Sequence, residues 1–315
     1  MKLIQKAVLG LVLMLTSDFC LLTPAASAAG YGTTAANFLS IGLGARPAAM
    51  GFAFAAISDD LNAIQYNPAG LGQLTGNNVA VTYLSYVQDV NYGWLAYSMP
   101  LELATPGTLG ISFGYLALAG FEKRGLSDTE TPSSTFGASD LLAAVTYSTR
   151  EMEGLALGAT IKLVSESIDT VRATGFALDL GAFLTLNDID PGLTASAALQ
   201  NLGTGLKFVN ITDPFPSNFK GGLAYKLLDK TLLLAGDVDY NFNDAKFSFR
   251  FGMEYWLQGM IAPRIGYGLA PAHLGSMAGL GAGLGLKISD LQVDYAFLPQ
   301  GDLGNTHRVT LGYKF

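Results

Sequence analysis

The chain has 315 residues, of which 50% are apolar and only 14% are charged, and its formal net charge is −7. Soluble domains carry roughly a quarter charged residues, so this composition is unusual for a soluble enzyme. After residue 28 no apolar run reaches the ~20 residues of a spanning helix, which excludes a helical membrane protein. The acidic balance argues against nucleic acid as a partner.

Residues 1–28 have the features of a secretory signal peptide. Two lysines lie within the first six residues, residues 7–15 are apolar, and Ala26-Ser27-Ala28 supplies a small-residue cleavage site. We expect this signal to be removed on export. Cys20, the only cysteine, lies within it, so the mature chain can form no disulfide in an oxidising compartment.

Residues 29–76 show no strand pattern. Ser58-Asp59-Asp60 is predicted to cap a short helix over residues 61–66, and Asn67-Pro68 is predicted to end it. The segment is too apolar for a free tail and too short for a separate domain. We therefore predict a hatch or plug, partly helical, in the lumen of the structure formed by the rest of the chain.

From residue 77 to residue 315 apolar and polar residues alternate with a period of two. In the last segment Val309, Leu311, Tyr313 and Phe315 share one face, and Arg308, Thr310, Gly312 and Lys314 share the other. Turn residues divide this region into about fourteen strands. They are predicted near 77–87, 91–101, 108–121, 136–150, 154–168, 170–187, 193–203, 216–228, 231–242, 245–257, 260–270, 275–288, 290–299 and 305–315.

The predicted fold class is all-β: a single closed antiparallel transmembrane β-barrel. Only a closed barrel satisfies its backbone hydrogen bonds in lipid without helices. A soluble β-sandwich also alternates, and the pattern alone permits it. The signal peptide and the terminal Tyr313 and Phe315, which resemble a barrel-insertion signal, favour the barrel. The implied location is the bacterial outer membrane, with its lipid and the barrel-assembly machinery as partners.

Charged residues on the polar strand faces are predicted to line the lumen. Asp237 falls opposite Arg250, and Asn241 opposite Lys246, if Asn243-Asp244 forms a turn. Such pairs neutralise lumen charge, or alternatively act as a selectivity filter. The lumen charges predicted are Lys162, Asp179, Asp237, Asp239, Lys246, Arg250, Glu254, Arg264, Asp294 and Arg308.

Three further sequence features bear on the fold and the function. Gly279, Gly281, Gly283 and Gly285 leave one face of a strand bare, so that the backbone of the hatch can approach it. The loops 125–137 and 201–216 are predicted to face the outside of the cell. Residues 110–114 match the spacing of a nucleophile elbow but lie mid-strand. No catalytic, cofactor or metal site is predicted.

A motif in the N-terminal segment resembles a known family. Gly44-Ala45-Arg46-Pro47-Ala48-Ala49-Met50-Gly51, then Asp59-Asp60 and Asn67-Pro68-Ala69-Gly70-Leu71, is similar to the PorV/PorQ family of FadL-like outer-membrane proteins. The resemblance covers about residues 38–75 and implies a fourteen-stranded barrel with an N-terminal hatch. Phe52 stands where such sequences often carry a second glycine. The hatch residues carried over are Arg46, Met50, Gly51, Asp59, Asp60, Asn67, Pro68, Ala69 and Gly70.

Three functions follow from the resemblance and the pattern. The first is a non-enzymatic barrel that passes or binds hydrophobic small molecules by movement of the hatch. The alternative is a docking barrel for secreted proteins, as in type IX secretion, without solute transport. A phospholipase-like barrel enzyme is the third.

Overall fold

The structure is a computed structural model that describes residues 33–124, 132–269 and 279–315. The predicted signal peptide with Cys20, the first half of the 125–137 loop and the first residues of the predicted strand 275–288 lie outside the described residues. None of the described helices is long and apolar enough to cross a membrane.

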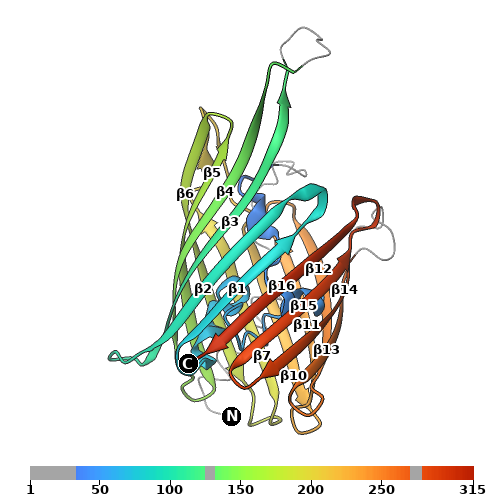
Figure 1. Cartoon of the computed structure of the whole chain (residues 1–315). Helices are drawn as coiled ribbons and strands as arrows, with labels where there is room; N and C mark the ends of the chain where they lie inside the picture. The colour runs from blue at the N-terminus through green and yellow to red at the C-terminus, as the bar shows by residue number, and fades with distance from the viewer. Residues whose placement is uncertain (1–32, 125–131, 270–278) are drawn as a thin grey trace.

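Fourteen of the described strands form one closed antiparallel barrel (Figure 1). Each strand pairs with its neighbours in the sequence, and β1 pairs with both β2 and β16, which closes the sheet. The closed fourteen-strand barrel predicted from the sequence is therefore confirmed. Its strands are β1 (Asn78–Ser85), β2 (Asn91–Leu101), β3 (Gly107–Lys123), β4 (Ser134–Thr149), β5 (Leu155–Ile168), β6 (Val171–Thr185), β7 (Leu193–Gly203), β10 (Asn218–Leu227), β11 (Leu232–Asn241), β12 (Lys246–Tyr255), β13 (Ile261–Gly268), β14 (Leu280–Ile288), β15 (Leu291–Pro299) and β16 (Asn305–Lys314).

Apolar side chains face outward and charged side chains face inward along these strands. In β16, Val309 and Leu311 are 40% and 48% exposed, whereas Arg308 and Thr310 are 1% and 4% exposed. Because successive residues of a strand point to opposite faces, the sheet presents an apolar outer surface to lipid. This orientation and the closed sheet argue against the soluble sandwich, in which apolar faces pack on each other.

The two ends of the barrel differ. Short connections join β2 to β3, β4 to β5 and β14 to β15 at the end where the chain terminates, while β3 and β4 project far beyond the opposite end (Figure 1). The longer loops therefore gather at one rim. The predicted loop 201–216 contains a two-stranded hairpin, β8 (Leu206–Lys207) and β9 (Thr212–Asp213), which the sequence pattern missed. β4 begins at Ser134, inside the loop predicted for 125–137.

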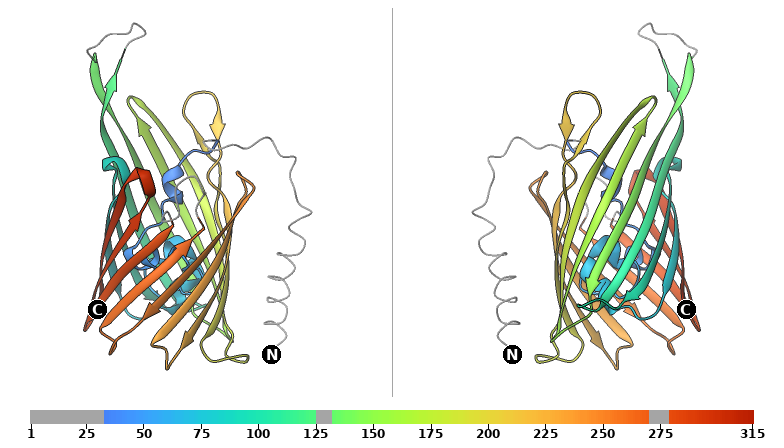
Figure 2. Two further views of the ribbon diagram at one scale, coloured as in Figure 1. Left: turned by 90° about the vertical axis from the view of Figure 1, so that its right-hand side faces the viewer. Right: turned by 90° about the vertical axis from the view of Figure 1, so that its left-hand side faces the viewer.

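The described part of the N-terminal segment runs between the barrel walls in both views of Figure 2. Its turns are short: η1 (Asn37–Ser40), α2 (Ala45–Ala49), α3 (Ala63–Tyr66) and η2 (Pro68–Gln73). The remaining short turns, η3 (Val87–Asp89) and η5 (Gly301–Leu303), lie in loops. α2 contacts β13 to β16, and η2 contacts β3 to β6 on another part of the wall.

The predicted cap is present at Asp60, but the helix starts later than predicted. Asp60 Oδ1 accepts from the Asn62 backbone N–H at 2.8 Å, the bond that a capping side chain makes two residues ahead of it. The first turn after Asp60 is held by bonds between residues three apart, and α3 begins only at Ala63. Asn67, predicted only to end the helix, caps η2 by accepting from the Ala69 N–H.

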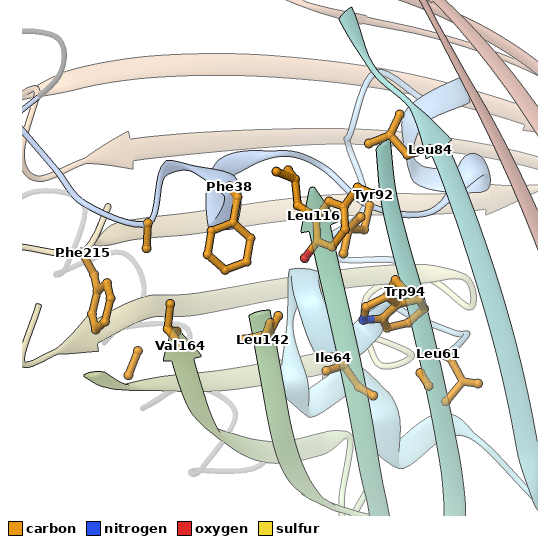
Figure 3. Close-up of a cluster of buried hydrophobic side chains, with 14 of the residues drawn as sticks. Phe38, Leu61, Ile64, Leu84, Tyr92, Trp94, Leu116, Leu142, Val164 and Phe215 are labelled. Atoms are coloured by element: carbon orange, nitrogen blue, oxygen red, sulfur yellow. The ribbon is translucent and has the colours of Figure 1, made fainter. Parts of the chain in front are cut away.

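An apolar cluster joins the segment to one side of the wall (Figure 3). Phe38 of η1 packs edge-on against Tyr92 of β2, with ring centroids 6.1 Å apart. Leu61 and Ile64 lie in the same cluster. The strand residues labelled with them in Figure 3 are Leu84, Trp94, Leu116, Leu142 and Val164, and Phe215 joins from the outer loop. Burial of these side chains opposes displacement of the segment.

Candidate functional site: the N-terminal segment and the charged inner wall

Glycines in the wall bring the backbone of the N-terminal segment into direct contact with the strands. A Cβ atom added at Gly266 would lie 1.9 Å from the Met50 carbonyl carbon, and one at Gly281 would lie 2.2 Å from the Ala48 oxygen. At Gly283 it would meet the Ala49 Cβ at 2.5 Å. The close backbone approach predicted for the β14 glycine face is therefore confirmed at Gly281, whereas at Gly283 the segment contributes only the Ala49 side chain and the Tyr295 oxygen of β15 lies closer, at 2.4 Å. Gly285 instead makes room for the Arg264 guanidinium.

A second glycine contact lies across the lumen. A Cβ atom at Gly158 of β5 would lie 2.4 Å from the Ala69 nitrogen, and one at Gly181 of β6 would lie 2.1 Å from Asn67 Oδ1. Within the segment, Gly70 leaves room for Ser58 at 2.2 Å. The motif residues around Asn67-Pro68-Ala69-Gly70 therefore pack directly against wall positions that carry no side chain.

Substituting Gly266 by alanine should loosen the segment. The added methyl group overlaps the Met50 backbone, which has no flexible side chain to yield, so we expect a loss of about 1–3 kcal/mol of stability. Gly93→Ala is the matched control, because nothing lies within 4 Å of its Cβ position. The thermal unfolding midpoint in detergent measures both. Equal midpoints for the two variants would show that the contact at Met50 is absent.

Arg46 of α2 links the segment to the wall by ion pairs. Its Nε and Nη2 donate to Glu254 of β12 at 2.7 and 2.9 Å. Nη1 donates to Asp59 at 2.6 Å and to Asp60 at 3.0 Å. One guanidinium therefore holds three carboxylates, two from its own segment and one from the barrel.

The network continues along the wall. Arg264 Nε donates to Glu254 at 2.6 Å and its Nη1 to Asp294 at 2.6 Å. The Trp256 indole N–H also donates to Glu254, at 2.9 Å. Glu254 is 1% exposed, so each of its charge-assisted bonds is shielded from water. Sequence reasoning placed Glu254, Arg264 and Asp294 in the lumen but did not connect them with Arg46.

The two aspartates of the segment respond to this network in opposite ways. Burial would raise the pKa of Asp59, but Arg46 and Lys226 outweigh burial and lower it below its ordinary value. Burial, with the adjacent Asp59, keeps the pKa of Asp60 above its ordinary value despite Arg46. Burial would lower the pKa of Arg46, yet its three carboxylate partners raise it well above the usual range.

Asp59→Asn and Asp60→Asn should therefore differ in pH dependence. Stability from ionised Asp59 is present above its unfolded-state pKa and is lost as the pH falls through the lowered folded-state value. For Asp60 the sign is opposite, because stability falls as the pH rises through its raised folded-state value. We expect Asp59→Asn to lower the unfolding midpoint at pH 7 and Asp60→Asn to leave it equal or higher. Equal losses at pH 7 would contradict this assignment.

Asp237 binds the segment rather than its cross-strand arginine. Its register opposite Arg250 is confirmed, as is that of Asn241 opposite Lys246. Yet Asp237 Oδ2 accepts from the backbone N–H groups of Phe54 and Ala55, each at 2.8 Å. Arg250 pairs with Asp239 at 2.6 Å. The predicted pairing of Asp237 with Arg250 is therefore wrong: Asp237 binds two backbone donors of the segment through one oxygen, and Arg250 pairs with the next inward-facing aspartate of β11.

The remaining predicted lumen charges differ in burial. Lys162 pairs with Asp179 at 2.5 Å, and both are buried, as is Arg308. Asp239 also pairs with Lys220, a buried lumen charge that was not predicted. Lys246, at the loop end of β12, is exposed.

Neutral side chains of the wall also bind the segment. Ser148 donates to the Ala69 carbonyl at 2.8 Å, and Gln200 Nε2 donates to the Gln65 carbonyl at 2.8 Å. Serine, threonine and glutamine are common on polar strand faces, so no signal in the sequence distinguished these anchors.

Cavities lie on both sides of the anchored segment. One of about 370 Å³ opens at the short-turn end and is lined by Asp59, Asp60 and the residues around the β14–β15 turn. Two smaller ones, of about 170 and 250 Å³, open toward the long loops. Ser40, Ile41 and Gly42 line both of these outer cavities. These two cavities at the long-loop end, which share residues 40–42 in their lining, are together called the outer chamber.

The comparisons with known proteins agree with this architecture. A search of curated proteins finds no match. The TodX deltaS2S3 mutant monoaromatic hydrocarbon channel superposes with a TM-score of 0.62 at 15% identity, covering 87% of this chain and 99% of that chain. The toluene transporter TbuX of Ralstonia pickettii gives 0.60 at 16% identity, covering 87% and 98%.

A Pseudomonas aeruginosa FadL homologue gives a TM-score of 0.57 at 10% identity and covers 86% of this chain and 98% of that chain. At these identities the likeness concerns the fold alone. A family model described as type IX secretion system protein PorV matches residues 25–241, more than half of the chain. With the barrel and the segment motif, this match identifies an outer-membrane barrel, and the chain belongs to the PorV family.

Proposed function

We propose that the chain is a non-catalytic barrel that passes or binds hydrophobic small molecules, with residues 29–76 as its plug and residues 1–28 removed on export. The observation that carries the proposal is the outer chamber. Apolar side chains, among them Ile41, Phe52, Tyr86 and Leu298, line one of its two cavities together with polar ones, and polar side chains predominate in the other. Ligand sites commonly combine an apolar lining with a small number of placed polar groups.

The plug has a firmly bound part and a lightly bound part. Residues 44–73 carry the Arg46 network, the Asp237 bonds and the glycine contacts. Residues 37–43 make fewer polar contacts with the wall and the rest of the segment. Tyr66 donates to the Leu43 carbonyl at 2.8 Å and Arg308 to the Gly42 carbonyl at 3.3 Å, and Phe38 adds apolar packing on Tyr92. Movement of residues 37–43 would join the two outer cavities while the lower part stays anchored. Local openings of this kind occur where stabilising contacts are few.

Uptake of toluene by cells tests the proposal, because two structurally similar barrels are named for aromatic hydrocarbons. Cells that make the chain should take up toluene several-fold faster than cells that lack it. Ile41→Trp should remove most of this gain by filling both cavities. Ile261→Trp should leave the gain unchanged, because Ile261 is 40% exposed and lies on the outer face of β13.

Equal uptake with and without the chain would refute the transport proposal. If cells that lack the chain also fail to display a secreted protein that is present on the surface of cells that make it, the docking alternative is favoured.

A further inference from the structure

Arg308 carries a buried positive charge to the outer chamber. Its side chain is 1% exposed and lines the 250 Å³ cavity. Its Nε donates to the Gly42 carbonyl at 3.3 Å and its Nη1 to the Thr306 hydroxyl at 2.8 Å, both neutral acceptors. Among the described residues no carboxylate forms an ion pair with it, whereas Arg46 and Arg264 each pair with Glu254.

A buried guanidinium with only neutral partners favours an anion. Removing a charge from water is costly unless an opposite charge or several hydrogen bonds compensate for it. Arg308 has five N–H donors, of which the two named bonds use two. An oxyanion in the cavity would meet the remaining donors with charge-assisted bonds, the strongest class available here.

Phe52 brings a second guanidinium to the same cavity. The guanidinium carbons of Arg308 and Arg250 lie 5.3 and 5.6 Å from the centre of its ring. Phe52 adopts a φ of +66°, which side-chain-bearing residues rarely adopt. The two cation–π contacts help to offset this strain and fix both cations at one wall of the cavity.

We propose that this cavity binds a small organic carboxylate. The carboxylate would lie at Arg308 and Arg250, and its apolar body would lie on Ile41, Tyr86 and Leu298. This inference goes beyond the proposed function, which requires only an apolar cargo.

The charges of the two ends agree with an anion held on the outer side. The outer cavities are lined by Lys220, Arg250 and Arg308 against one carboxylate, Asp239. The cavity at the short-turn end is lined by four carboxylates and two lysines: Asp59, Asp60, Asp290, Asp294, Lys287 and Lys314. A free anion is therefore attracted to the outer cavities and repelled from the cavity at the short-turn end.

Calorimetric titration of the purified full-length mature chain with sodium benzoate and with benzyl alcohol tests the site. The two probes have similar size, and only benzoate carries a charge. We expect benzoate to bind at least about tenfold more tightly, which corresponds to about 1.4 kcal/mol. Arg308→Met should abolish this preference by weakening benzoate binding at least about tenfold, to the level of benzyl alcohol. Arg150→Met, at an exposed ion pair with Glu102, should change the affinity for neither probe.

Methionine at position 308 replaces a buried charge that has no charged partner, a change that proteins commonly tolerate. Arg250→Met provides a second variant, expected to weaken benzoate binding as well. Equal affinity of the wild-type chain for the two probes, or undiminished benzoate binding by folded Arg308→Met, would overturn the inference. Because binding is measured without transport, failure of toluene uptake leaves this test intact.

Discussion

Replacing Arg46 by methionine is expected to accelerate hydrogen exchange in residues 44–73 by about 100-fold or more. The substitution removes one cation from among three carboxylates, so Glu254 keeps only Arg264 and Asp59 keeps only Lys226 as charged partners. Breaking a buried ion pair by removing one partner costs about 3–5 kcal/mol. Each 1.4 kcal/mol is about a tenfold change in the open population.

Exchange is best read at the Phe54 and Ala55 amides, which donate to Asp237 and report whether the segment stays on the wall. Arg150→Met is the matched control. Its ion pair with Glu102 is exposed on both sides, and exposed pairs contribute about 0–1 kcal/mol. Protection of both amides in Arg46→Met at the wild-type level would show that the network does not hold the segment.

Deleting Phe315 is expected to reduce the amount of barrel in the outer membrane several-fold. Phe315 N–H donates to the Asn77 carbonyl at 2.9 Å, and its carbonyl accepts from the Asn77 N–H at 3.0 Å. These bonds extend the β1–β16 pairing that closes the barrel. The ring is 59% exposed, stacks on Tyr313 and lies 6.3 Å from Tyr97 on the outer face.

Two further variants separate the contributions of the backbone and the ring. Phe315→Ala keeps the two backbone bonds and loses the aromatic side chain. Phe247→Ala removes an equally large and 63% exposed ring elsewhere on the outer face. Immunoblots of outer-membrane fractions compare them. If the deleted chain reaches the membrane in wild-type amounts, Phe315 is neither a closing residue nor an insertion signal.

The barrel was predictable because its determinants are local. Alternation at Val309, Leu311 and Tyr313 fixes which face meets lipid, and the turn at Asn243-Asp244 fixes the register of Asp237 opposite Arg250. Both depend on residues within one hairpin. The pairing of Arg250 with Asp239 rather than with Asp237 could not be predicted from the hairpin alone. Asp237 binds the Phe54 and Ala55 amides, which lie 183 and 182 residues from it in the sequence.

The site was only partly predictable for the same reason. The motif indicated that Arg46, Asp59 and Asp60 belong to the hatch. Glu254, the wall partner of Arg46, lies 208 residues from Arg46 in the sequence and was not connected with it. The cap at Asp60 was predictable because it is a local bond, made to the N–H only two residues ahead. The anchors at Ser148 and Gln200 arise only once the barrel has closed around the segment.

Single-channel conductance in planar bilayers tests most directly whether the N-terminal segment closes the lumen. We predict that the wild-type chain conducts almost no ions, and that a chain lacking residues 33–73 conducts in large, steady steps, as open polar barrels do. Steady pore-sized conductance of the wild-type chain would show that the segment leaves the lumen open.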